Sequence, residues 1–325
     1  MSESKQPLLK LENVKKYYPI KGGLLQRVQG YVKAVENVSL DVFAGESIGI
    51  VGESGCGKST LGRTILGLEE ATDGSIFFRG EEISRLPERQ RKRWKKEMQM
   101  VFQDPYASLN PRQRIGHALE EVFVIHTNMT KAEREERVLQ LLQEVGLRPE
   151  HYDRYPHEFS GGQRQRIGIA RAIALNPSLV ICDEAVSALD VSVQAQIIKL
   201  LKDIQEKHEL TYLFISHDLG VVRHFCNRVL VMYLGHAVEL ALSQELYTNP
   251  LHPYTKALLS AIPRLKPGVK RERIRLEGDL PNPANPPKGC PFHTRCPVAT
   301  ERCKQERPKW KEAAPGHFVA CHEVK

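Results

Sequence analysis

Apolar and polar residues alternate along the first part of the chain, as they do in β-strands with one buried face. The alternation covers residues 9–14 and 32–42, and residues 74–80 form another strand-like segment between two glycines. At residues 48–51 a short apolar run replaces the alternation. We therefore predict a small β layer together with one fully buried strand.

Two further largely apolar runs, at residues 179–182 and 212–216, predict strands that are buried on both faces of a parallel sheet. Each run ends in polar residues that can carry chemistry, Asp183-Glu184 after the first and His217-Asp218 after the second. Apolar stripes at helical spacing predict helices at residues 130–147, at residues 164–175 and after Asp190, which can cap its helix. Two apolar segments around Gly235-His236, at residues 229–234 and 237–242, predict a closing hairpin.

The composition of the chain changes near residue 250. The 325 residues are 41% hydrophobic and 26% charged overall, which is ordinary for a globular protein. After residue 250 prolines become frequent and the periodicity fades. We expect a domain at residues 1–250 and an extension at residues 251–325 that is folded by something other than a large apolar core.

The charge balance is basic, with 47 Lys and Arg against 39 Asp and Glu, a formal charge of +8. A basic chain can meet nucleic acid, an anionic membrane or an acidic partner. The densest basic run, residues 89–96, surrounds a single tryptophan. Without interleaved aromatic residues for base stacking, it indicates the solvated face of a short helix. The N-terminus has no secretory signal and no apolar run is long enough to cross a bilayer, so we expect a cytoplasmic protein with peripheral membrane contact.

The segment after the buried strand at 48–51 matches the phosphate-loop consensus G-x-x-x-x-G-K-S/T at every position. Glycines let backbone N–H groups turn toward an anion, Lys58 supplies a positive charge to the β- and γ-phosphates, and the Ser59 hydroxyl can ligate Mg²⁺. The helix that follows points its positive end at the same phosphates. The sequence therefore predicts a nucleoside triphosphate site. Its residues are Gly52, Glu53, Ser54, Gly55, Cys56, Gly57, Lys58, Ser59 and Thr60.

Further motifs follow the phosphate loop in a fixed order: Ser160-Gly161-Gly162-Gln163, then Asp183-Glu184, then Asp190, then His217. In this order the sequence resembles the ATP-binding subunits of ABC transporters, from Tyr18 to His217. The resemblance implies an α/β P-loop NTPase fold. It would contain a RecA-like core, an antiparallel β subdomain and a helical subdomain at about residues 104–172.

The resemblance also implies catalytic roles. Gln103 would contact Mg²⁺ and the attacking water, and its loop would sense the membrane partner. Asp183 would hold Mg²⁺ through water, and Glu184 would be the general base. His217 would reach the γ-phosphate and Lys58 would stabilise it. One position departs from the family: Ala185 replaces the usual proline, which removes a backbone constraint but no ligand.

Two more parts of the nucleotide site come from the resemblance. Tyr18 would stack on the adenine, with Tyr17 as its rival for that role. Ser160, Gly161, Gly162 and Gln163 would form a second anion site at the start of a helix, and Asp190 would lie close to the nucleotide. In the family this second anion site faces the ATP of the opposite subunit, so that ATP closes a dimer and hydrolysis opens it.

Four of the seven cysteines are crowded into the last 36 residues: Cys290, Cys296, Cys303 and Cys321. In a reducing compartment such a cluster favours metal ligation over disulfides. The segments His252–Pro263 and Cys290–Pro297 resemble the C-terminal extension of dipeptide and oligopeptide importer ATPases, which nickel-importer relatives share. The resemblance implies a 4Fe–4S cluster on the four cysteines. Zinc is the alternative, although the spacings lack the paired C-x₂-C of zinc ribbons.

The resemblance thus predicts an ATPase that energises import of dipeptides or oligopeptides from the cytoplasmic face of the membrane. Its partners would be two transmembrane permease subunits, a second ATPase subunit that is a paralogue or a copy of this chain, and an extracytoplasmic binding protein. Nucleic acid would not be a partner. The alternatives are a soluble ABC ATPase acting on nucleic acid, ribosomes or cofactor assembly, a nickel importer ATPase, and a nucleotide-binding redox protein.

Overall fold

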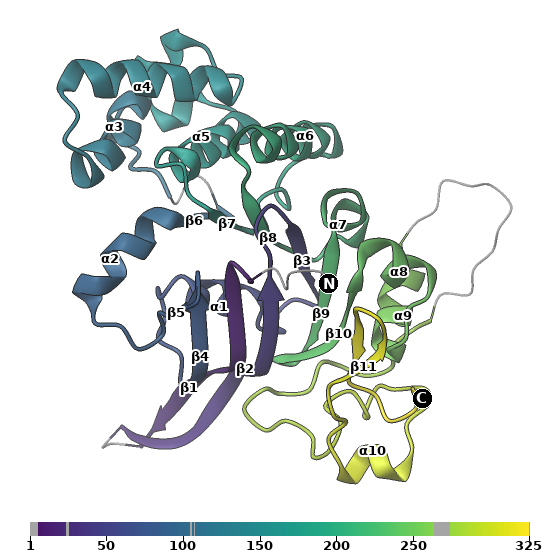
Figure 1. The fold of residues 1–325 in the computed structure, drawn as a ribbon. Coiled ribbons are helices and arrows are strands. Elements are labelled where there is room, and N and C mark those ends of the chain that lie inside the picture. The colour runs from purple at the N-terminus through teal and green to yellow at the C-terminus, as the bar shows by residue number, and fades with distance from the viewer. Residues whose placement is uncertain (1–5, 24–25, 105, 107, 263–273, 325) are drawn as a thin grey trace, which may run out of the picture. The chain divides into compact units, whose positions relative to one another are not determined.

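The computed structural model describes residues 6–23, 26–104, 106, 108–262 and 274–324 (Figure 1). The chain divides into two compact units. The first consists of Met1–Phe43, Ser47–Arg85 and Ser216–Lys325, and the second of Ala44–Glu46 and Leu86–Ile215.

The first unit begins with a four-stranded antiparallel sheet, coloured purple to blue in Figure 1. Its strand order is β2-β1-β4-β5. The strands are β1 (Leu9–Gly22), β2 (Arg27–Val42), β4 (Asp73–Phe78) and β5 (Glu81–Glu82). Leu9, Leu11 and Val14 of β1 are fully or almost fully buried, and the residues between them are more exposed. The predicted β layer is therefore confirmed, because alternation along each strand gives the sheet one apolar face.

The first unit also contains a set of strands that runs in the order β11-β12-β10-β9-β3. β3 (Ser47–Val51) pairs in parallel with β9 (Arg228–Tyr233), and every residue of β3 is buried. β9 and β10 (His236–Leu242) form the predicted hairpin. The remaining strands are β11 (Lys311–Ala314) and β12 (His317–Val319). The helices of this unit are α1 (Lys58–Ile65), α7 (Leu219–Phe225), α8 (Ser243–Thr248), α9 (Pro253–Ser260) and α10 (Glu301–Gln305).

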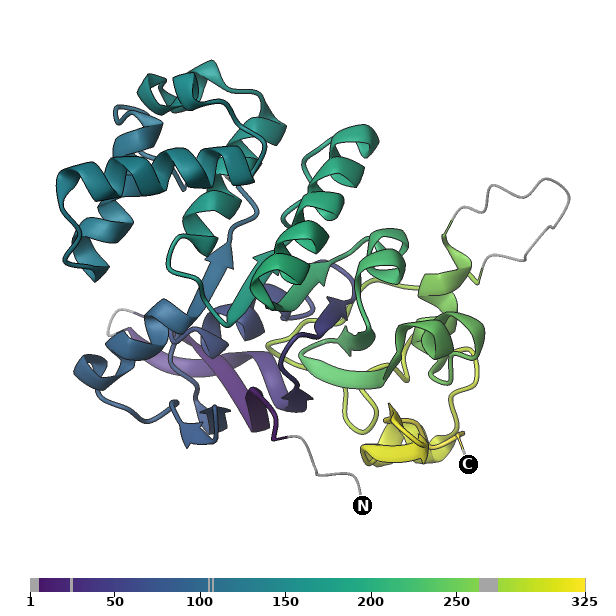
Figure 2. The ribbon, with the colours of Figure 1, turned by 45° about the horizontal axis from the view of Figure 1, so that its top comes forward.

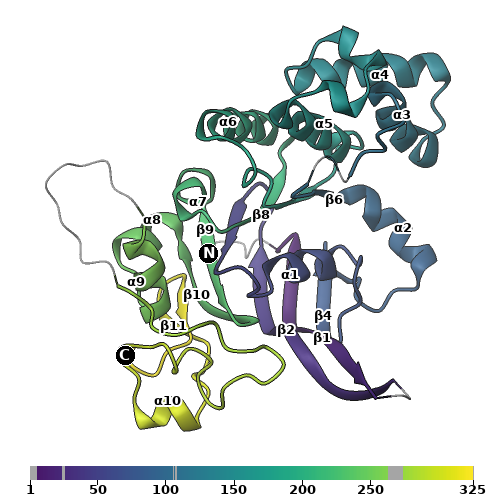
Figure 3. The ribbon, with the colours of Figure 1, turned by 180° about the vertical axis from the view of Figure 1, so that it is seen from behind.

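The second unit combines three parallel strands with most of the helices. β6 (Met98–Val101), β7 (Leu179–Asp183) and β8 (Thr211–Ser216) pair in that order, and all residues of β7 and β8 are buried, as their apolar runs predict. Helices α3, α4 and α5 gather beside one another (Figure 2, Figure 3). The helices are α2 (Glu88–Glu97), α3 (Ile115–His126), α4 (Lys131–Glu144), η1 (Pro149–Asp153), η2 (Pro156–Glu158), α5 (Gly161–Ile173) and α6 (Val191–His208).

The sequence explains the start of helix α4 and the helical structure of the basic run in the second unit. Thr130 and Glu133 form a reciprocal capping box at the start of α4. The basic run 89–96 lies in α2, where the Arg93 guanidinium stacks over the Trp94 ring at 4.5 Å. The helix prediction for this run is confirmed.

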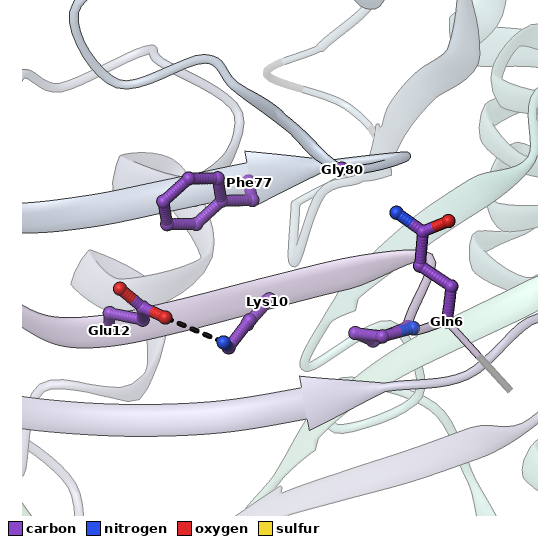
Figure 4. A pocket seen from close by; sticks show the side chains of 6 residues that line it. Gln6, Lys10, Glu12, Phe77 and Gly80 are labelled. Carbon is purple, nitrogen blue, oxygen red and sulfur yellow. Dashed lines mark ion pairs between the residues drawn. The ribbon is translucent and has the colours of Figure 1, made fainter. Parts of the chain in front are cut away.

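The antiparallel sheet carries a shallow pocket of about 260 Å³, lined by Gln6, Pro7, Lys10, Glu12, Phe77 and Gly80 (Figure 4). Lys10 Nζ lies 2.6 Å from Glu12 Oε1, and both side chains are 44% exposed. An exposed pair of this kind adds little stability because water screens it. The lining includes none of the predicted site residues.

The C-terminal extension is joined to this unit through a buried carboxylate. Glu239 of β10 is fully buried and accepts hydrogen bonds from the backbone N–H groups of Leu251 (2.7 Å) and His252 (3.0 Å). His317 of β12 contacts the same carboxylate, with 2.7 Å between Nε2 and Oε1. β12 pairs with β10 at this point. A chain segment near the C-terminus thus completes the hydrogen bonding of a charge that would be costly to bury alone.

His252 gives this junction a pH dependence. Its ring Nδ1 accepts the Tyr254 N–H at 3.1 Å and caps α9, while burial lowers the pKa of the ring to about 4. Because the unfolded chain binds the proton with a pKa of about 6.5, the contribution is complete above that pH and is lost as the pH falls toward 4. By pH 4 the loss approaches roughly 3 kcal/mol.

We therefore expect the thermal unfolding midpoint to fall between pH 7 and pH 5, and less steeply in a His252→Asn variant. Asparagine caps a helix without titrating, so the difference between the two proteins isolates the histidine. Identical pH profiles would show that His252 does not cause the dependence.

Candidate active site

The phosphate loop runs from the end of β3 to the start of α1. Gly57 precedes α1 with a φ of +100°, and a Cβ at this position would lie 2.0 Å from the carbonyl oxygen of Ala34. Only glycine fits this conformation and this close approach. Ser54 and Gly55, at the tip of the loop, are exposed, whereas Cys56 is fully buried. Burial raises the pKa of the Cys56 thiol, so that it stays neutral.

Lys58 is the buried cation of this loop, with only 4% of its surface exposed. Its Nζ donates to the carbonyl oxygens of Gly52 at 2.9 Å and Glu53 at 3.0 Å. These two bonds hold the ammonium within the loop. A compact ammonium in this position can pair with phosphate oxygens, as the motif predicts.

Tyr17 and Tyr18, the rivals for the adenine, have different surroundings. The Tyr17 hydroxyl donates to Glu36 Oε1 at 2.8 Å, and burial together with Glu36 raises the pKa of the phenol. The Tyr18 hydroxyl bonds to Glu69, and the Lys16 ammonium lies 5.0 Å from the Tyr18 ring centre. Both rings are partly exposed, and the choice of Tyr18 stays a prediction.

His217 follows directly after β8 and belongs to the first unit. It is exposed, although the strand before it is buried. The next residue, Asp218, accepts the backbone N–H groups of Gly220 and Val221 and so caps α7. The strand end and the cap fix the backbone on both sides of the histidine.

Asp183 is the last residue of strand β7 in the second unit, and Glu184 follows it. Asp183 is 2% exposed, and Glu184 has a φ of +47°, an uncommon conformation for a residue other than glycine. The Glu184 N–H donates to Ile215 O at 3.0 Å, and the Glu184 carbonyl accepts both the N–H and the hydroxyl of Ser187. These bonds hold the backbone of Glu184 in place beside Ala185.

Gln103 lies in the same unit, and the structure brings it to Glu184. Its Nε2 donates to Glu184 Oε2 at 2.9 Å, although the two residues are 81 positions apart in sequence. A carboxylate and an amide joined in this way each keep a further hydrogen-bonding atom that can orient a water molecule. The sequence placed both residues in the site; their direct hydrogen bond could not be inferred from it.

The Ser160–Gln163 motif starts helix α5. The Gln163 N–H donates to Ser160 Oγ at 3.3 Å, and the Ser160 N–H donates to Gln163 Oε1 at 3.0 Å. Gly162 allows close packing, because a Cβ there would lie 2.5 Å from Val193 Cγ1. Asp190 accepts the Val193 N–H at 2.9 Å and caps α6, as the sequence predicts. The hydrogen bonds from Ser192 and Val193 lower the pKa of Asp190.

The four late cysteines lie in the first unit. Cys290 and Cys303 are buried, Cys296 and Cys321 are partly exposed, and Cys290 N–H donates to Cys303 O at 2.8 Å. Burial raises the pKa of Cys290 to about 11, and the three other thiols of the cluster contribute to the shift.

Backbone N–H groups oppose this effect at three of the sulfurs. Those of Phe292, Val298 and Glu323 reach Cys290, Cys296 and Cys321 and offset part of the rise in pKa that burial causes at each thiol. Such bonds suit thiolate ligands. Among the residues that the structure describes, however, no group of three or more His, Cys, Asp or Glu side chains is arranged to hold a metal ion. Thiolates are suitable ligands for the predicted metal. In the described part of the chain, however, the four side chains are not arranged as a metal site.

The sequence analysis missed one pair of residues at the phosphate loop. Arg295 lies inside the Cys290–Pro297 motif, and its guanidinium binds the carboxylate of Glu53 with both Nη atoms. The Glu53 carboxylate raises the pKa of Arg295. The two residues are 242 positions apart, and no local pattern signals their contact.

Comparison with known proteins places these features in a class. The profile of the ABC transporter family matches residues 35–187, and the profile described as the oligopeptide/dipeptide transporter C-terminal region matches residues 238–303. A solved dimer of the ATP-binding cassette MJ0796 bound to ADP and Pi is 30% identical, with a TM-score of 0.65, and covers 72% of this chain and 98% of the cassette. The fold and the family match therefore define an ABC-type P-loop ATPase, as the sequence predicted.

Full-length relatives narrow the class. The oligopeptide transport ATP-binding protein AppF of Bacillus subtilis is 61% identical over 322 residues, 98% of either chain. The dipeptide transport ATP-binding protein DppF of Haemophilus influenzae is 51% identical over 318 residues, 98% of this chain and 97% of DppF. The chain belongs to the ATP-binding subunits of ABC-type oligopeptide and dipeptide transporters.

Proposed function

We propose that this chain hydrolyses ATP to energise the import of dipeptides or oligopeptides through a membrane permease. The observation that carries the proposal is the match of residues 238–303 to the C-terminal region of oligopeptide and dipeptide transporters, in a chain that also carries a complete phosphate loop. The close relatives favour this function over an ABC ATPase that acts on nucleic acid and over a nickel importer ATPase.

The proposed roles of the site residues are those that the family resemblance implies, and their chemistry suits them. Lys58 neutralises the charge of the β- and γ-phosphates. Ser59 and Gln103 contact Mg²⁺ directly, and Asp183 holds it through water. Glu184 takes a proton from the attacking water, and Gln103 orients that water. His217 donates to the γ-phosphate, and Tyr18 stacks on the adenine. The remaining nucleotide contacts would come from the phosphate loop, from the Ser160–Gln163 motif and from Asp190. They are Gly52, Glu53, Ser54, Gly55, Cys56, Gly57, Thr60, Ser160, Gly161, Gly162, Gln163 and Asp190.

The mechanism we propose is a dimer that closes on ATP and opens after hydrolysis. The start of α5, with Ser160 as its cap, presents backbone N–H groups that suit an anion. In a closed dimer this anion would be the γ-phosphate of the ATP on the opposite subunit. The opposite subunit is a paralogue or a second copy of this chain.

The transporter family pairs such ATPases with membrane permease subunits. None of the helices in the described part of the chain is both long and apolar enough to span a membrane. We place the protein on the cytoplasmic face, attached peripherally to two permease subunits, with a peptide-binding protein on the opposite side. Pull-down of the tagged chain from detergent-solubilised membranes tests this. Permease subunits among the captured proteins support the proposal, and capture of RNA or DNA instead contradicts it.

For the C-terminal extension we propose that Cys290, Cys296, Cys303 and Cys321 hold a 4Fe–4S cluster, with zinc as the alternative. Support comes from the grouping of four cysteines in one unit and from the N–H groups that reach three of their sulfurs. A bound metal would cross-link a short proline-rich segment that has little regular structure.

Anaerobically purified protein is expected to contain iron and sulfide and to absorb broadly in the visible range. A Cys296→Ser/Cys303→Ser double variant should lose both signals, whereas Cys226→Ser, outside the extension, should keep them. Zinc without iron would select the alternative metal. Neither metal in the wild-type protein would contradict the proposal.

The boundaries of the parts also remain a proposal: an ATPase domain at residues 1–250 with a helical subdomain at about 104–172, and an extension at 251–325. The ATPase domain at residues 1–250 would carry all the residues that we propose for the nucleotide site. The extension nevertheless contributes β12 to the sheet of the first unit.

A further inference from the structure

The C-terminal extension contacts the phosphate loop at Glu53. Arg295 Nη1 lies 2.7 Å from Glu53 Oε2, and Nη2 lies 3.2 Å from Oε1. The Arg295 side chain is 9% exposed and that of Glu53 is 30% exposed. A bidentate arginine–carboxylate ion pair is strong and fixes the relative orientation of its two side chains. Because this pair is largely shielded from water, it is not the weak surface type.

The backbone of Glu53 is held as well. Its N–H donates to the Tyr254 hydroxyl at 2.8 Å, and Tyr254, on α9, is fully buried. The Glu53 carbonyl accepts the Lys58 ammonium at 3.0 Å. The same carbonyl accepts the Cys56 N–H at 3.2 Å. Glu53 is therefore held by two residues of the extension and, within the loop, by Lys58 and Cys56.

An aromatic cluster holds Arg295 and Tyr254 in place. The rings of Tyr233, Tyr254 and Phe292 lie 4.8–5.4 Å apart, with Tyr233 edge-on to both others. Phe292 is 1% exposed and lies three residues before Arg295 in a tight turn, where the Arg295 N–H donates to Phe292 O at 3.0 Å. The guanidinium also lies 6.0 Å from the centre of the Tyr233 ring. Both side chains that reach Glu53 thus start from one rigid, water-excluding support.

We propose that Arg295 and Tyr254 are positioning residues of the phosphate loop, which hold Glu53 so that the loop and Lys58 are pre-organised for ATP. The inference rests on the proposed ATPase function and extends it, since it makes nucleotide affinity depend on the C-terminal extension. Neither residue touches ATP; each acts through Glu53. A loop that is already in its binding conformation loses less entropy when the ligand arrives.

The test compares full-length variants of the two residues in Mg²⁺-ATP binding, steady-state hydrolysis and amide hydrogen exchange at residues 52–58. Arg295→Gln removes the charge, Arg295→Lys keeps the charge without the two-pronged geometry, and Tyr254→Phe removes only the hydroxyl. Arg302→Gln is the matched control, because it breaks an exposed arginine–glutamate pair elsewhere in the same extension.

We expect Arg295→Gln to raise the Kd for Mg²⁺-ATP about tenfold, equivalent to ~1.4 kcal/mol, with a similar rise in KM and kcat within about twofold. Arg295→Lys and Tyr254→Phe should show part of the effect, and Arg302→Gln none. Without nucleotide, exchange at residues 52–58 should be faster in Arg295→Gln and Tyr254→Phe than in the control. Combining Arg295→Gln with Glu53→Gln should add little to either change alone, because the two residues form one interaction.

Wild-type affinity together with wild-type exchange in Arg295→Gln and Tyr254→Phe would overturn the inference. Equal rises in Kd and in exchange for Arg302→Gln would also overturn it, since they would indicate general loosening of the extension. If the wild-type protein bound no ATP, the proposed function would fail, while the exchange rates would still show whether the extension holds the loop. The conservative Tyr254→Phe variant keeps the test open should Arg295→Gln not fold.

Discussion

Glu184→Gln is expected to bind Mg²⁺-ATP with near wild-type affinity and to hydrolyse it about 10²–10⁴-fold more slowly. The substitution removes the proton acceptor while keeping the size of the side chain. Its amide oxygen can still accept the hydrogen bond that Gln103 Nε2 makes to Glu184 at 2.9 Å, so the local geometry should survive. Bound ATP should then persist, and the dimer that it closes should accumulate. Hydrolysis assays and size-exclusion chromatography with and without ATP measure both effects.

Glu206→Gln is the control for this experiment, because Glu206 is an exposed carboxylate on α6 of the same unit. It should hydrolyse ATP like the wild type and form no ATP-trapped dimer. Wild-type turnover in Glu184→Gln would remove Glu184 from the catalytic role and leave the attacking water without the base that we assign.

Lys58→Ala is expected to weaken Mg²⁺-ATP binding roughly a hundredfold or more, equivalent to ~2.8 kcal/mol, and to abolish measurable hydrolysis. The lysine supplies a buried positive charge, and hydrogen bonds to charged groups are worth more than neutral ones. Its loss also leaves the carbonyls of Gly52 and Glu53 without the donor that they now share. Calorimetric titration with Mg²⁺-ATP measures the affinity.

Lys202→Ala, which removes an exposed lysine on α6, should bind ATP normally. Circular dichroism of Lys58→Ala should show a folded protein, since Lys58 is the first residue of α1 and alanine is a strong helix former. Unchanged ATP affinity in a folded Lys58→Ala protein would contradict the assignment of this loop to phosphate binding.

Local patterns in the sequence predicted much of the fold. The buried strands β7 and β8, the hairpin β9–β10 and the cap at Asp190 all follow from features a few residues long. In each case the hydrophobic pattern or the capping residue decides the structure without distant partners.

Features that depend on distant partners could not be predicted. β12 pairs with β10 across almost eighty residues, and its three residues are too few to show a pattern. The positive φ of Glu184 is set by hydrogen bonds to Ile215 and Ser187. The extension was expected to fold without a large core, yet Phe292 packs against Tyr233 and Tyr254, one before the boundary near residue 250 and one after it.

In the candidate site, too, features set by adjacent residues could be predicted and features set by distant residues could not. The phosphate loop, the Ser160–Gln163 motif and the acids after β7 could be found because their chemistry requires adjacent residues of fixed type. The pair of Glu53 and Arg295 joins positions 242 apart, and only the folded chain reveals it. The choice between Tyr17 and Tyr18 depends on the contact of one ring with the adenine, which no local pattern encodes.

Peptide uptake into proteoliposomes tests the central claim most directly. The transporter captured with this chain would be reconstituted with its peptide-binding protein outside and Mg²⁺-ATP inside, and labelled peptide in the lumen would be measured against time. We predict accumulation that requires ATP and that stops when the chain carries Glu184→Gln. Accumulation of the same extent without ATP, or with the Glu184→Gln chain as the ATPase, would contradict the account.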